Sequence, residues 1–468
     1  MNDHVELRSA YADSVALLRV SRDVQAVPGV VTAQVAMATP LNLEVVTGLG
    51  FDVPATTSSH DMVVAIRLTD DGDLAVALAA VDRALTPTRE TSGGGGPEVA
   101  PRTTGSALEA GPATVLVSVP GASAYVEAMD ALDADCDVMV FSDHVPLEQE
   151  VSLKRTARER GLLVMGPDCG TAVVGGLGLG FANLTRPGPV GLVAASGTGC
   201  QQLLALLDHA GVGVTHALGV GGRDLSAEVG GLATLEALRR LDADDSVELV
   251  VLVSKPPAPE VATRVEAYAA GLATPVETAL LGPGRPDLTA AAEATLRRLG
   301  VVPPQWPVAG RAQPGRGGLL RGLFAGGTLC EEARLIAAGA GVDGRLVDFG
   351  DDHYTAGRAH PMIDPTLRLQ ELRRAATDPA TGVLLLDVVL GHGADPDPAA
   401  TLAPVLSKAA VPAGVPAVVP AVVTVVGTAL DPQDRDRQVA ALVAAGAEVH
   451  LSNATATRRA CELVAGAR

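Results

Sequence analysis

The chain has 468 residues, a formal net charge of −19 and only 2% aromatic residues. A chain of this length is expected to form about three or four domains, each large enough to bury its own core. Strong acidity without a basic stripe argues against a nucleic-acid partner. The first residues lack the apolar core of a signal peptide, and no apolar run reaches the roughly 18 residues of a membrane span, so we predict a cytoplasmic protein that binds no membrane. The five cysteines show no paired metal-ligand spacing, so no metal site is predicted.

Residues 1–85 are expected to form a small α+β domain. Apolar periodicity predicts strands at 14–20 and 61–68 and helices at 22–26, 30–49 and 74–85. This order of elements suits a ferredoxin-like unit. The next stretch, 86–112, contains four consecutive glycines and several prolines. Such a composition cannot bury enough apolar surface to offset its ordering entropy, so a flexible linker is predicted there.

A regular alternation of strands and helices follows the linker. The predicted strands are 114–119, 138–141 and 162–165, and the helices between them are 123–132 and 147–160. Alternation at this spacing predicts parallel strands with helices on both faces and a ligand site at the carboxyl ends of the strands. The turns at those ends are 120–123, 142–146 and 166–170.

The remaining sequence predicts two copies of one doubly wound domain. Each copy contains an apolar strand, a glycine turn and a helix, and the turns are Ala195-Ser196-Gly197-Thr198-Gly199-Cys200 and Ala325-Gly326-Gly327-Thr328-Leu329-Cys330. Unpaired N–H groups and the positive end of the helix dipole at such a turn suit phosphate or carboxylate. We predict phosphate binding, against the alternative of simple packing turns, by Ser196, Gly197, Thr198, Gly199, Gly326, Gly327 and Thr328. If both turns face one cleft, their helices would share a doubly charged phosphate.

From Tyr125 onward, the chain resembles the α subunit of succinyl-CoA synthetase and the wider NDP-forming acyl-CoA ligases. Residues 165–169 are similar to that family's GPNC turn, residues 188–198 to its GxVGIVSRSGT phosphate turn, and residues 221–224 to its GIGGDP segment. With the segments 357–365 and 384–391, the whole chain looks like the FdrA branch of these proteins.

The resemblance implies an α/β fold with a small N-terminal ferredoxin-like domain. Behind that domain it implies a Rossmann-like CoA-binding-type domain and two tandem flavodoxin-like ligase-type domains. The expected boundaries are 1–85, a linker at 86–112, and then 113–185, 186–305 and 316–468.

The resemblance also implies a function. FdrA-type proteins are associated with an oxamate carbamoyltransferase complex in allantoin (ureide) catabolism, which converts oxalurate and phosphate into oxamate and carbamoyl phosphate. The expected partners are a small carboxylic acid or amide and other subunits, in an oligomer. Phosphate or carbamoyl phosphate is expected as a substrate, and no cofactor is assigned. One alternative is a subunit of an NDP-forming acyl-CoA ligase, and another is a non-catalytic scaffold that binds phosphate or CoA.

The chain departs from the ligases in three ways. The stretch 280–300, where the ligases carry their phosphorylated histidine, contains no histidine. No counterpart of the CoA-phosphate loop and no ATP-grasp segment is identified, so binding of CoA is left open. His392, in the Gly391-His392-Gly393-Ala394 turn, resembles the phosphohistidine motif but follows a different strand, and the alternative is a bystander in a glycine turn.

Asp143, His144 and His360 are the catalytic candidates. Asp143 and His144 lie in a turn where the ligases carry a carboxylate near phosphate, and His144 would move a proton to or from the transferred amide nitrogen. Alternatively, Asp143 caps the helix that follows Pro146. His360 lies with His353 in an acidic segment, 351–364, where the ligand spacing is not that of a metal site.

Two turns and one arginine are the candidates for substrate binding. They are Gly166, Pro167, Asp168 and Cys169 in the first turn, Gly222, Arg223 and Asp224 in the second, and Arg358. The arginines would hold a carboxylate with both guanidinium nitrogens. The alternatives are a buried thiol for Cys169 and surface ion pairs with Asp224 or Asp364 for the two arginines.

Overall fold

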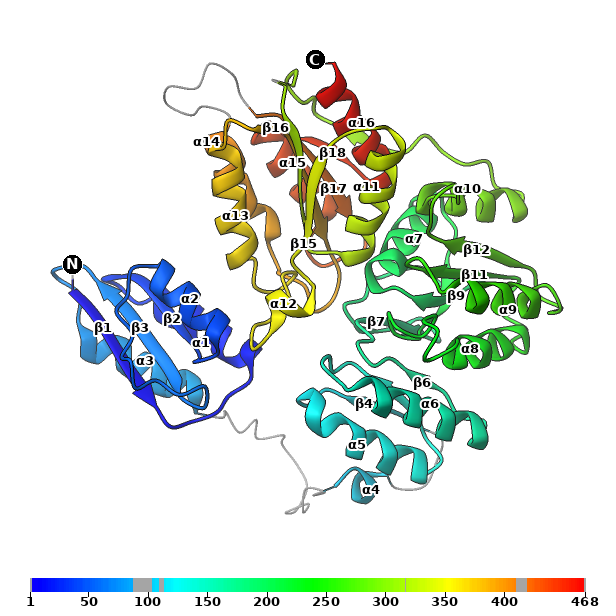
Figure 1. Cartoon of the computed structure of the whole chain (residues 1–468), viewed down its shortest axis with the longest axis horizontal. Helices are drawn as coiled ribbons and strands as arrows, with labels where there is room; N and C mark the ends of the chain where they lie inside the picture. Colours follow the sequence, from blue (N-terminus) through cyan, green and yellow to red (C-terminus); the bar gives the residue numbers. More distant parts are fainter. Residues whose placement is uncertain (1, 87–102, 109–112, 316, 410–418, 467–468) are drawn as a thin grey trace. The chain divides into compact units, whose positions relative to one another are not determined.

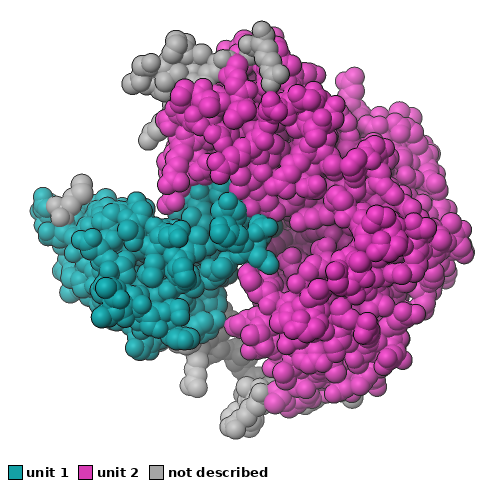
Figure 2. All heavy atoms as spheres, in the orientation of Figure 1, with its two compact units in different colours: residues 1–99, 349–368 teal, residues 100–348, 369–468 magenta. Residues whose placement is uncertain are grey.

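The computed structural model describes all residues except 1, 87–102, 109–112, 316, 410–418 and 467–468. The chain divides into two compact units (Figure 2), one with Met1–Val99 and Phe349–Arg368 and the other with Ala100–Asp348 and Leu369–Arg468. The segment 349–368 therefore belongs to the N-terminal unit, although its sequence position had placed it in the second ligase-type domain. The predicted linker at 86–112 lies mostly outside the described residues, and its described part contains the short helix α4 (Thr104–Ala107).

The N-terminal domain is a three-stranded antiparallel sheet with helices on both faces (Figure 1). Its elements are β1 (Asn2–Arg8), α1 (Ser14–Gln25), β2 (Val30–Met37), α2 (Pro40–Gly48), β3 (Met62–Leu68) and α3 (Leu74–Leu85). The strand order β1-β3-β2 is the split arrangement expected of a ferredoxin-like unit. Alternate side chains of β3 face opposite ways: Val64 and Ile66 pack with α1 and α3, and Val63 and Ala65 pack with α2.

Two predictions in this domain are wrong. The predicted strand at 14–20 is the start of α1, because Asp13 accepts hydrogen bonds from the N–H groups of Val15 and Ala16 and starts a helix there. Residues 30–37 form strand β2 rather than the first half of a helix, and pairing with β3 fixes them in the sheet. The sequence prediction also missed β1, which pairs with the other edge of β3.

The next domain confirms the predicted strand–helix alternation. Strands β4 (Thr114–Val117), β5 (Asp137–Val140) and β6 (Val164–Met165) are parallel, and the helices α5 (Gly121–Asp133) and α6 (Leu147–Arg160) connect them. A hairpin follows, formed by β7 (Thr171–Val174) and β8 (Leu177–Gly180). It joins the sheet of the following domain, where β7 pairs with β10, so this sheet begins earlier than the predicted boundary at 185.

The first ligase-type domain is a doubly wound sheet with the strand order β12-β11-β9-β10-β7-β8. Its strands are β9 (Val190–Ala195), β10 (Val214–Gly219), β11 (Leu249–Ser254) and β12 (Val276–Leu280), and its helices are α7 (Gly197–His209), α8 (Leu232–Asp242), α9 (Pro259–Ala269) and α10 (Leu288–Arg298). The four strands β9 to β12 are parallel, as the sequence predicted.

The second ligase-type domain repeats this arrangement in the order β13-β18-β17-β16-β14-β15. Its strands are β13 (Val308–Ala309), β14 (Leu319–Phe324), β15 (Gly344–Asp348), β16 (Thr381–Val389), β17 (Ala421–Val426) and β18 (Glu448–His450). Its helices are α11 (Gly327–Gly339), α13 (Thr366–Thr377), α14 (Pro398–Ala409), α15 (Arg435–Ala444) and α16 (Asn453–Ala465), whereas α12 (Asp352–Thr355) lies in the segment 349–368 of the N-terminal unit. The neighbours β11-β9-β10 and β16-β14-β15 correspond, which is the flavodoxin-like order.

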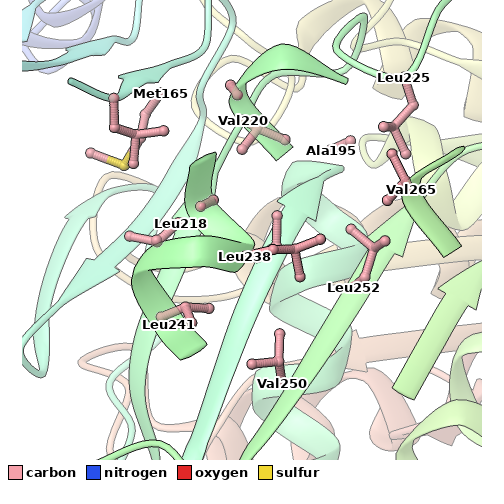
Figure 3. Packing of buried hydrophobic residues seen from close by; sticks show 14 of the residues in the cluster. Met165, Ala195, Leu218, Val220, Leu225, Leu238, Leu241, Val250, Leu252 and Val265 are labelled. Atoms are coloured by element: carbon pink, nitrogen blue, oxygen red, sulfur yellow. The ribbon is translucent and has the colours of Figure 1, made fainter. Parts of the chain in front are cut away.

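One apolar core runs from the Rossmann-like sheet into the first ligase-type sheet. Figure 3 shows Met165 of β6 in the same cluster as Leu218 of β10, Leu252 of β11 and Leu238 of α8. All of these side chains are at most 6% exposed. The turns at the carboxyl ends of the two sheets are thereby supported by a common core.

Candidate functional site

The candidate site is formed by the glycine turns that open α7 and α11. In the first sheet, β9 lies between β10 and β11, and in the second, β14 lies between β15 and β16. The strand order reverses at both places, and open α/β sheets bind ligands in the crevice beyond such a switch point. Both turns therefore occupy the position in their domain where a ligand site is most expected.

The structure brings the two turns into direct contact. The Ser196 hydroxyl lies 2.7 Å from Thr328 Oγ1, and both side chains are at most 4% exposed. A Cβ atom on Gly326 would lie 2.9 Å from both Cγ2 and Oγ1 of Thr198, closer than packed carbon atoms approach. The two helix N-termini meet, and a glycine at 326 permits their close approach.

The N–H groups at the two helix starts are satisfied to different degrees. Ser196 is the N-cap of α7, and its Oγ accepts from the N–H of Gly199. At α11 the N-cap is Gly326, which has no capping side chain. Asp387 of β16 accepts from the N–H groups of Ala325 and Gly326, just before this helix. The first N–H groups of each helix have no partner within the helix, and Gly197 is exposed to solvent.

Charged groups near this contact were missed by the sequence analysis. A Cβ atom on Gly327 would lie 2.8 Å from Lys255 Nζ and 2.4 Å from Asp348 Oδ2, so both side chains flank the start of α11. Lys255 directly follows β11 and Asp348 ends β15. One signal was available, because Lys255 is one of only three lysines in the chain and follows a strand end. Asp387, inside an otherwise apolar strand, was a second signal.

The cysteines near the site are buried thiols. Burial raises the pKa of Cys200 to about 12, and burial also raises the pKa values of Cys169 and Cys330. A thiolate is disfavoured at all three positions, so none of them is an activated nucleophile in this state. Cys169 fits the buried-thiol alternative, with its sulfur 3.6 Å from the Thr171 carbonyl oxygen.

The turns of the Rossmann-like domain lie together at the carboxyl ends of their strands. The N–H of Asp168 donates to the Ser142 carbonyl oxygen, which joins the turn after β6 to the turn that holds Asp143 and His144. His144 Nδ1 lies 3.1 Å from Asp143 Oδ1, and both side chains are partly exposed. Asp143 does not cap α6, whose N-cap is Pro146 without a side-chain hydrogen bond.

The turn at 166–169 contacts the β10–α8 connection, and Thr171 at the start of β7, just after that turn, lies beside the glycine turn of α7. A Cβ atom on Gly197 would lie 3.6 Å from Thr171 Oγ1, and one on Gly221 would lie 2.6 Å from the Pro167 carbonyl oxygen. Gly166 is held among backbone atoms in the same way, with the Val140 carbonyl oxygen 2.3 Å from its Cβ position. The predicted substrate-binding turns at 166–169 and 222–224 are thus in contact with each other, and Thr171 is the residue that reaches the start of α7.

Arg223 and Asp224 belong to a buried charge network between the Rossmann-like domain and the first ligase-type domain. Lys154 Nζ lies 2.8 Å from both Glu150 Oε1 and Asp224 Oδ1, and all three side chains are at most 1% exposed. Arg223 pairs with Glu150 rather than with Asp224, which corrects the ion-pair partner expected from the sequence. Gly222, beside them, is exposed. The network holds α6 to the β10–α8 connection.

Glu332 lies in the contact between the two ligase-type domains. Its carboxylate accepts from the N–H of Leu288 at the start of α10 and from Asn453 Nδ2 of α16, both at 2.7 Å. Complete burial, together with the nearby Asp287, raises the pKa of Glu332 to about 7. A group that titrates near neutrality therefore joins the helix that carries the second glycine turn to the other domain.

Comparison with known proteins places the chain in a family. It is 36% identical to the uncharacterized protein YahF of Escherichia coli (strain K12) over 486 aligned residues, which span 94% of each protein. This chain belongs to the YahF family. In this chain, residues 323–463 match the domain model described as CoA-ligase. Residues 1–101 match the domain model described as AllF, heavy metal-associated domain.

More distant similarities include a subunit of a CoA ligase and two solved structures. The α subunit of ADP-forming succinate–CoA ligase from Staphylococcus aureus (strain Mu50) is 28% identical over 151 residues, which cover 31% of this chain and 49% of that subunit. Among solved structures, PH0766 from Pyrococcus horikoshii OT3 covers 76% of this chain and 84% of its own, with 14% identity and a TM-score of 0.29. ATP citrate lyase from Methanothrix soehngenii, with 20% identity, covers 41% of this chain and 36% of its own, with a TM-score of 0.32.

The heavy-metal description of the N-terminal domain does not match the residues of this YahF-family chain. Residues 1–101 contain no cysteine. Over the described part of the chain, no group of three or more His, Cys, Asp or Glu side chains could hold a metal ion. The domain therefore lacks the donor set that its family description implies. Among the described helices of the chain, none is long and apolar enough to cross a membrane.

Arg358 and His360 lie in the N-terminal unit and not in the unit that contains Ser196 and Thr328. Arg358 donates to Asn42 Oδ1 at 2.9 Å and pairs with Asp364. Arg358 therefore forms the ion pair with Asp364 that was the alternative to substrate binding, but this pair is buried and not at the surface. His392 is exposed, and its N–H donates to the Ala182 carbonyl oxygen.

Proposed function

We propose that this chain supplies the phosphate site of an oxamate carbamoyltransferase complex, in which oxalurate and phosphate give oxamate and carbamoyl phosphate. The observation that carries the proposal is the meeting of two helix N-termini, at Ser196 and Thr328, at the switch points of two sheets. Each N-terminus bears a partial positive charge of about half an elementary charge. Two of them, with Lys255 beside them, favour a multiply charged anion such as phosphate.

The proposed reaction is an acyl transfer that forms no covalent intermediate with the enzyme. A phosphate oxygen attacks the ureido carbonyl carbon of oxalurate, the bond from that carbon to the oxalyl amide nitrogen breaks, and this nitrogen takes up one proton to give oxamate. Negative charge develops on the carbonyl oxygen during the attack. The N–H groups at Gly197 and Gly327 and the Lys255 ammonium are the groups of this chain that would stabilise it. The raised pKa values of Cys169 and Cys200 are consistent with a mechanism without a thiolate.

The distribution of charge favours one side of the site for the anion. Asp387 and Asp348 place carboxylates beside the start of α11. Among the described residues, no carboxylate oxygen lies within 4 Å of a Cβ atom placed on Gly197 at the start of α7, and Gly197 is open to solvent. We therefore place phosphate against Gly197–Gly199. Lys255 lies beside Gly327 and Asp348 at the end of β11, and its side chain would have to turn toward α7 to contact this phosphate. The turn at 166–169, which leads into Thr171 beside Gly197, is our candidate for holding the carboxylate end of the substrate.

Proton transfer and partner subunits complete the proposal. His144 is the candidate for protonating the leaving nitrogen, and Asp143, at 3.1 Å, orients its ring. The relatives of this chain include a subunit of a larger ligase, which supports assembly with other subunits. We propose that an oligomer with such partners, and not this chain alone, carries out turnover.

Phosphorolysis of oxalurate tests the proposal directly. The purified chain, alone and then with the products of neighbouring genes, is incubated with oxalurate and phosphate, and carbamoyl phosphate is measured by trapping with ornithine or by ³¹P NMR. We expect formation of carbamoyl phosphate with the partners present. Failure in both settings contradicts the proposal.

The second candidate is a subunit of an NDP-forming acyl-CoA ligase, which the CoA-ligase match at 323–463 favours. That reaction needs a phosphorylated histidine, and the stretch 280–300 has none. Incubation with γ-labelled ATP and the same partners distinguishes the two candidates. An acid-labile histidine phosphate that forms acyl-CoA supports the ligase, whereas binding of phosphate or CoA with no turnover supports a scaffold.

A further inference from the structure

The N-terminal domain holds a peptide segment of its own chain. Residues 349–368, which leave the second ligase-type domain between β15 and α13, form one compact unit with residues 1–99. Hydrogen bonds from Arg22, Thr39 and Asn42 of the domain to this segment make the contact specific.

Asn42 is at the centre of the contact. Its side chain is 2% exposed, and its Nδ2 donates to the Met37 carbonyl oxygen at 2.9 Å and to the Gly357 carbonyl oxygen at 3.0 Å. Its Oδ1 accepts from Arg358 Nη1 at 2.9 Å. The buried amide of Asn42 thus makes hydrogen bonds both within the N-terminal domain and to the segment. If the segment moved away, buried polar groups would lose their partners, at a cost in free energy.

Two further interactions hold the segment. Arg358 and Asp364 form a buried ion pair inside it, and Asp364 also accepts from the N–H of Thr366 at the start of α13. On the side of the domain, Arg22 of α1 donates to the Ile363 carbonyl oxygen at 3.0 Å. The segment is therefore fixed at 356–358 and at 363–366, and residues 349–355 join the first of these anchors to β15.

The segment is joined directly to the candidate site. Phe349, its first residue, follows Asp348, whose carboxylate lies beside Gly327 at the start of α11. At its other end, α13 continues from Thr366 into the second ligase-type domain without a break. The segment that the N-terminal domain binds is therefore continuous in sequence with the carboxyl end of β15.

We propose that the N-terminal domain is a positioning domain, which grips residues 349–368 through Asn42 and Arg22 and thereby holds Asp348 and the end of β15 in place at the glycine turn of α11. Asn42, Arg22 and Arg358 are positioning residues in this scheme and do not touch substrate. The link to phosphate binding rests on the proposed function, whereas the restraint of β15 does not.

Hydrogen exchange of the full-length chain tests the proposal. Arg22→Ala removes the bond to Ile363, and Asn42→Ala removes the central amide. Arg19→Ala is the matched control, because Arg19 is exposed on the same helix. We expect at least a tenfold faster amide exchange in 349–368 and in 344–348 for Arg22→Ala and Asn42→Ala, and no change for Arg19→Ala. Because Asn42 is buried, Arg22→Ala is the deciding variant if Asn42→Ala does not fold.

Faster exchange confined to 349–368, with β15 unchanged, overturns the proposal, and so does unchanged exchange in both segments. Tight binding of Zn²⁺ or Cu⁺ by the purified native chain, measured by dialysis and elemental analysis and abolished by changes in residues 1–85, also overturns it. Phosphate affinity of the native chain is measured separately by equilibrium dialysis with ³²P-phosphate. Absence of phosphate binding by the native chain contradicts the proposed function alone, because the exchange result stands without it.

Discussion

At the scale of single residues, the environment of a side chain decides its chemistry. Cys169 and Cys200 are suggestive in sequence, next to turns that look functional, but burial raises their pKa values and leaves them as packed thiols. Glu332 shows the reverse case, since it is unremarkable in the sequence. Its burial between two domains makes it a carboxyl group that titrates near neutrality.

The first prediction concerns Glu332 and pH. Its pKa is about 7 in the folded chain, above its ordinary value of 4.5, so the folded chain binds this proton more tightly than the unfolded chain. Its contribution to the free energy of unfolding is therefore largest below pH 4.5 and falls by roughly 3 kcal/mol as pH rises through 7. Glu332→Gln removes the titration. We expect the variant to gain stability relative to the native chain between pH 5 and pH 8, as measured by urea midpoints, and an equal difference at both pH values would contradict the assignment.

The second prediction concerns Lys255. Lys255→Met removes the ammonium beside Gly327 while retaining the length of the side chain. A charge-assisted hydrogen bond to an anion is worth roughly 1.5–3 kcal/mol, so phosphate should bind about 10- to 100-fold more weakly. Equilibrium dialysis with ³²P-phosphate measures this loss. Arg239→Gln, at an exposed ion pair on α8, is the control and should bind phosphate like the native chain. If Lys255→Met retains native affinity, Lys255 lies outside the site.

At the scale of elements, the two glycine turns matter because of how their helices meet. Each turn alone is a common packing feature of a doubly wound domain, and one helix N-terminus is a weak indication of a ligand. Here the starts of α7 and α11 are in contact through Ser196, Thr198 and Thr328, which concentrates two partial positive charges in one place. The close approach depends on the absence of a side chain at Gly326.

The third prediction follows from that contact. Gly326→Ala places a methyl group 2.9 Å from two atoms of Thr198 and 3.0 Å from Asp387 Oδ2, so the two helix starts must separate. Overpacking of this kind costs about 1–3 kcal/mol. We expect a lower melting temperature and weaker phosphate binding. Gly339→Ala, at the other end of α11 where a Cβ meets nothing within 4 Å, is the control and should be neutral or stabilising. Equal melting temperatures for the two variants would refute the close-approach argument.

At the scale of the whole molecule, buried polar groups join the successive domains of the second unit. Lys154, Glu150 and Asp224 link the Rossmann-like domain to the first ligase-type domain. Asp431 of the second ligase-type domain accepts from Leu184 N–H and from Asn183 Nδ2, which ties the second ligase-type domain to the first. These bonds fix the domains that supply the two glycine turns.

The fourth prediction is that Lys154 is essential for this junction. Lys154→Met leaves the carboxylates of Glu150 and Asp224 buried without their cation, and removal of one partner from a buried pair costs about 3–5 kcal/mol. The urea midpoint should fall sharply. Arg160→Gln, at an ion pair on the same helix in which both partners are partly exposed, should change stability by less than about 1 kcal/mol. Similar losses in the two variants would show that the network is not a structural junction.

The sequence by itself determined the strands of the Rossmann-like domain, the strand, glycine turn and helix that open each ligase-type domain, and the duplication, because apolar runs and glycine turns at regular spacing are local signals. It failed in the N-terminal domain, where Asp13 starts a helix in a stretch predicted as a strand and pairing with β3 makes residues 30–37 a strand. Only the tertiary structure decided which groups meet. The contact of Ser196 with Thr328, the placement of Lys255 and Asp387, and the transfer of 349–368 to the N-terminal unit all join residues far apart in the chain. Such contacts depend on packing between segments that are distant in sequence, and the local pattern of residues does not indicate that packing.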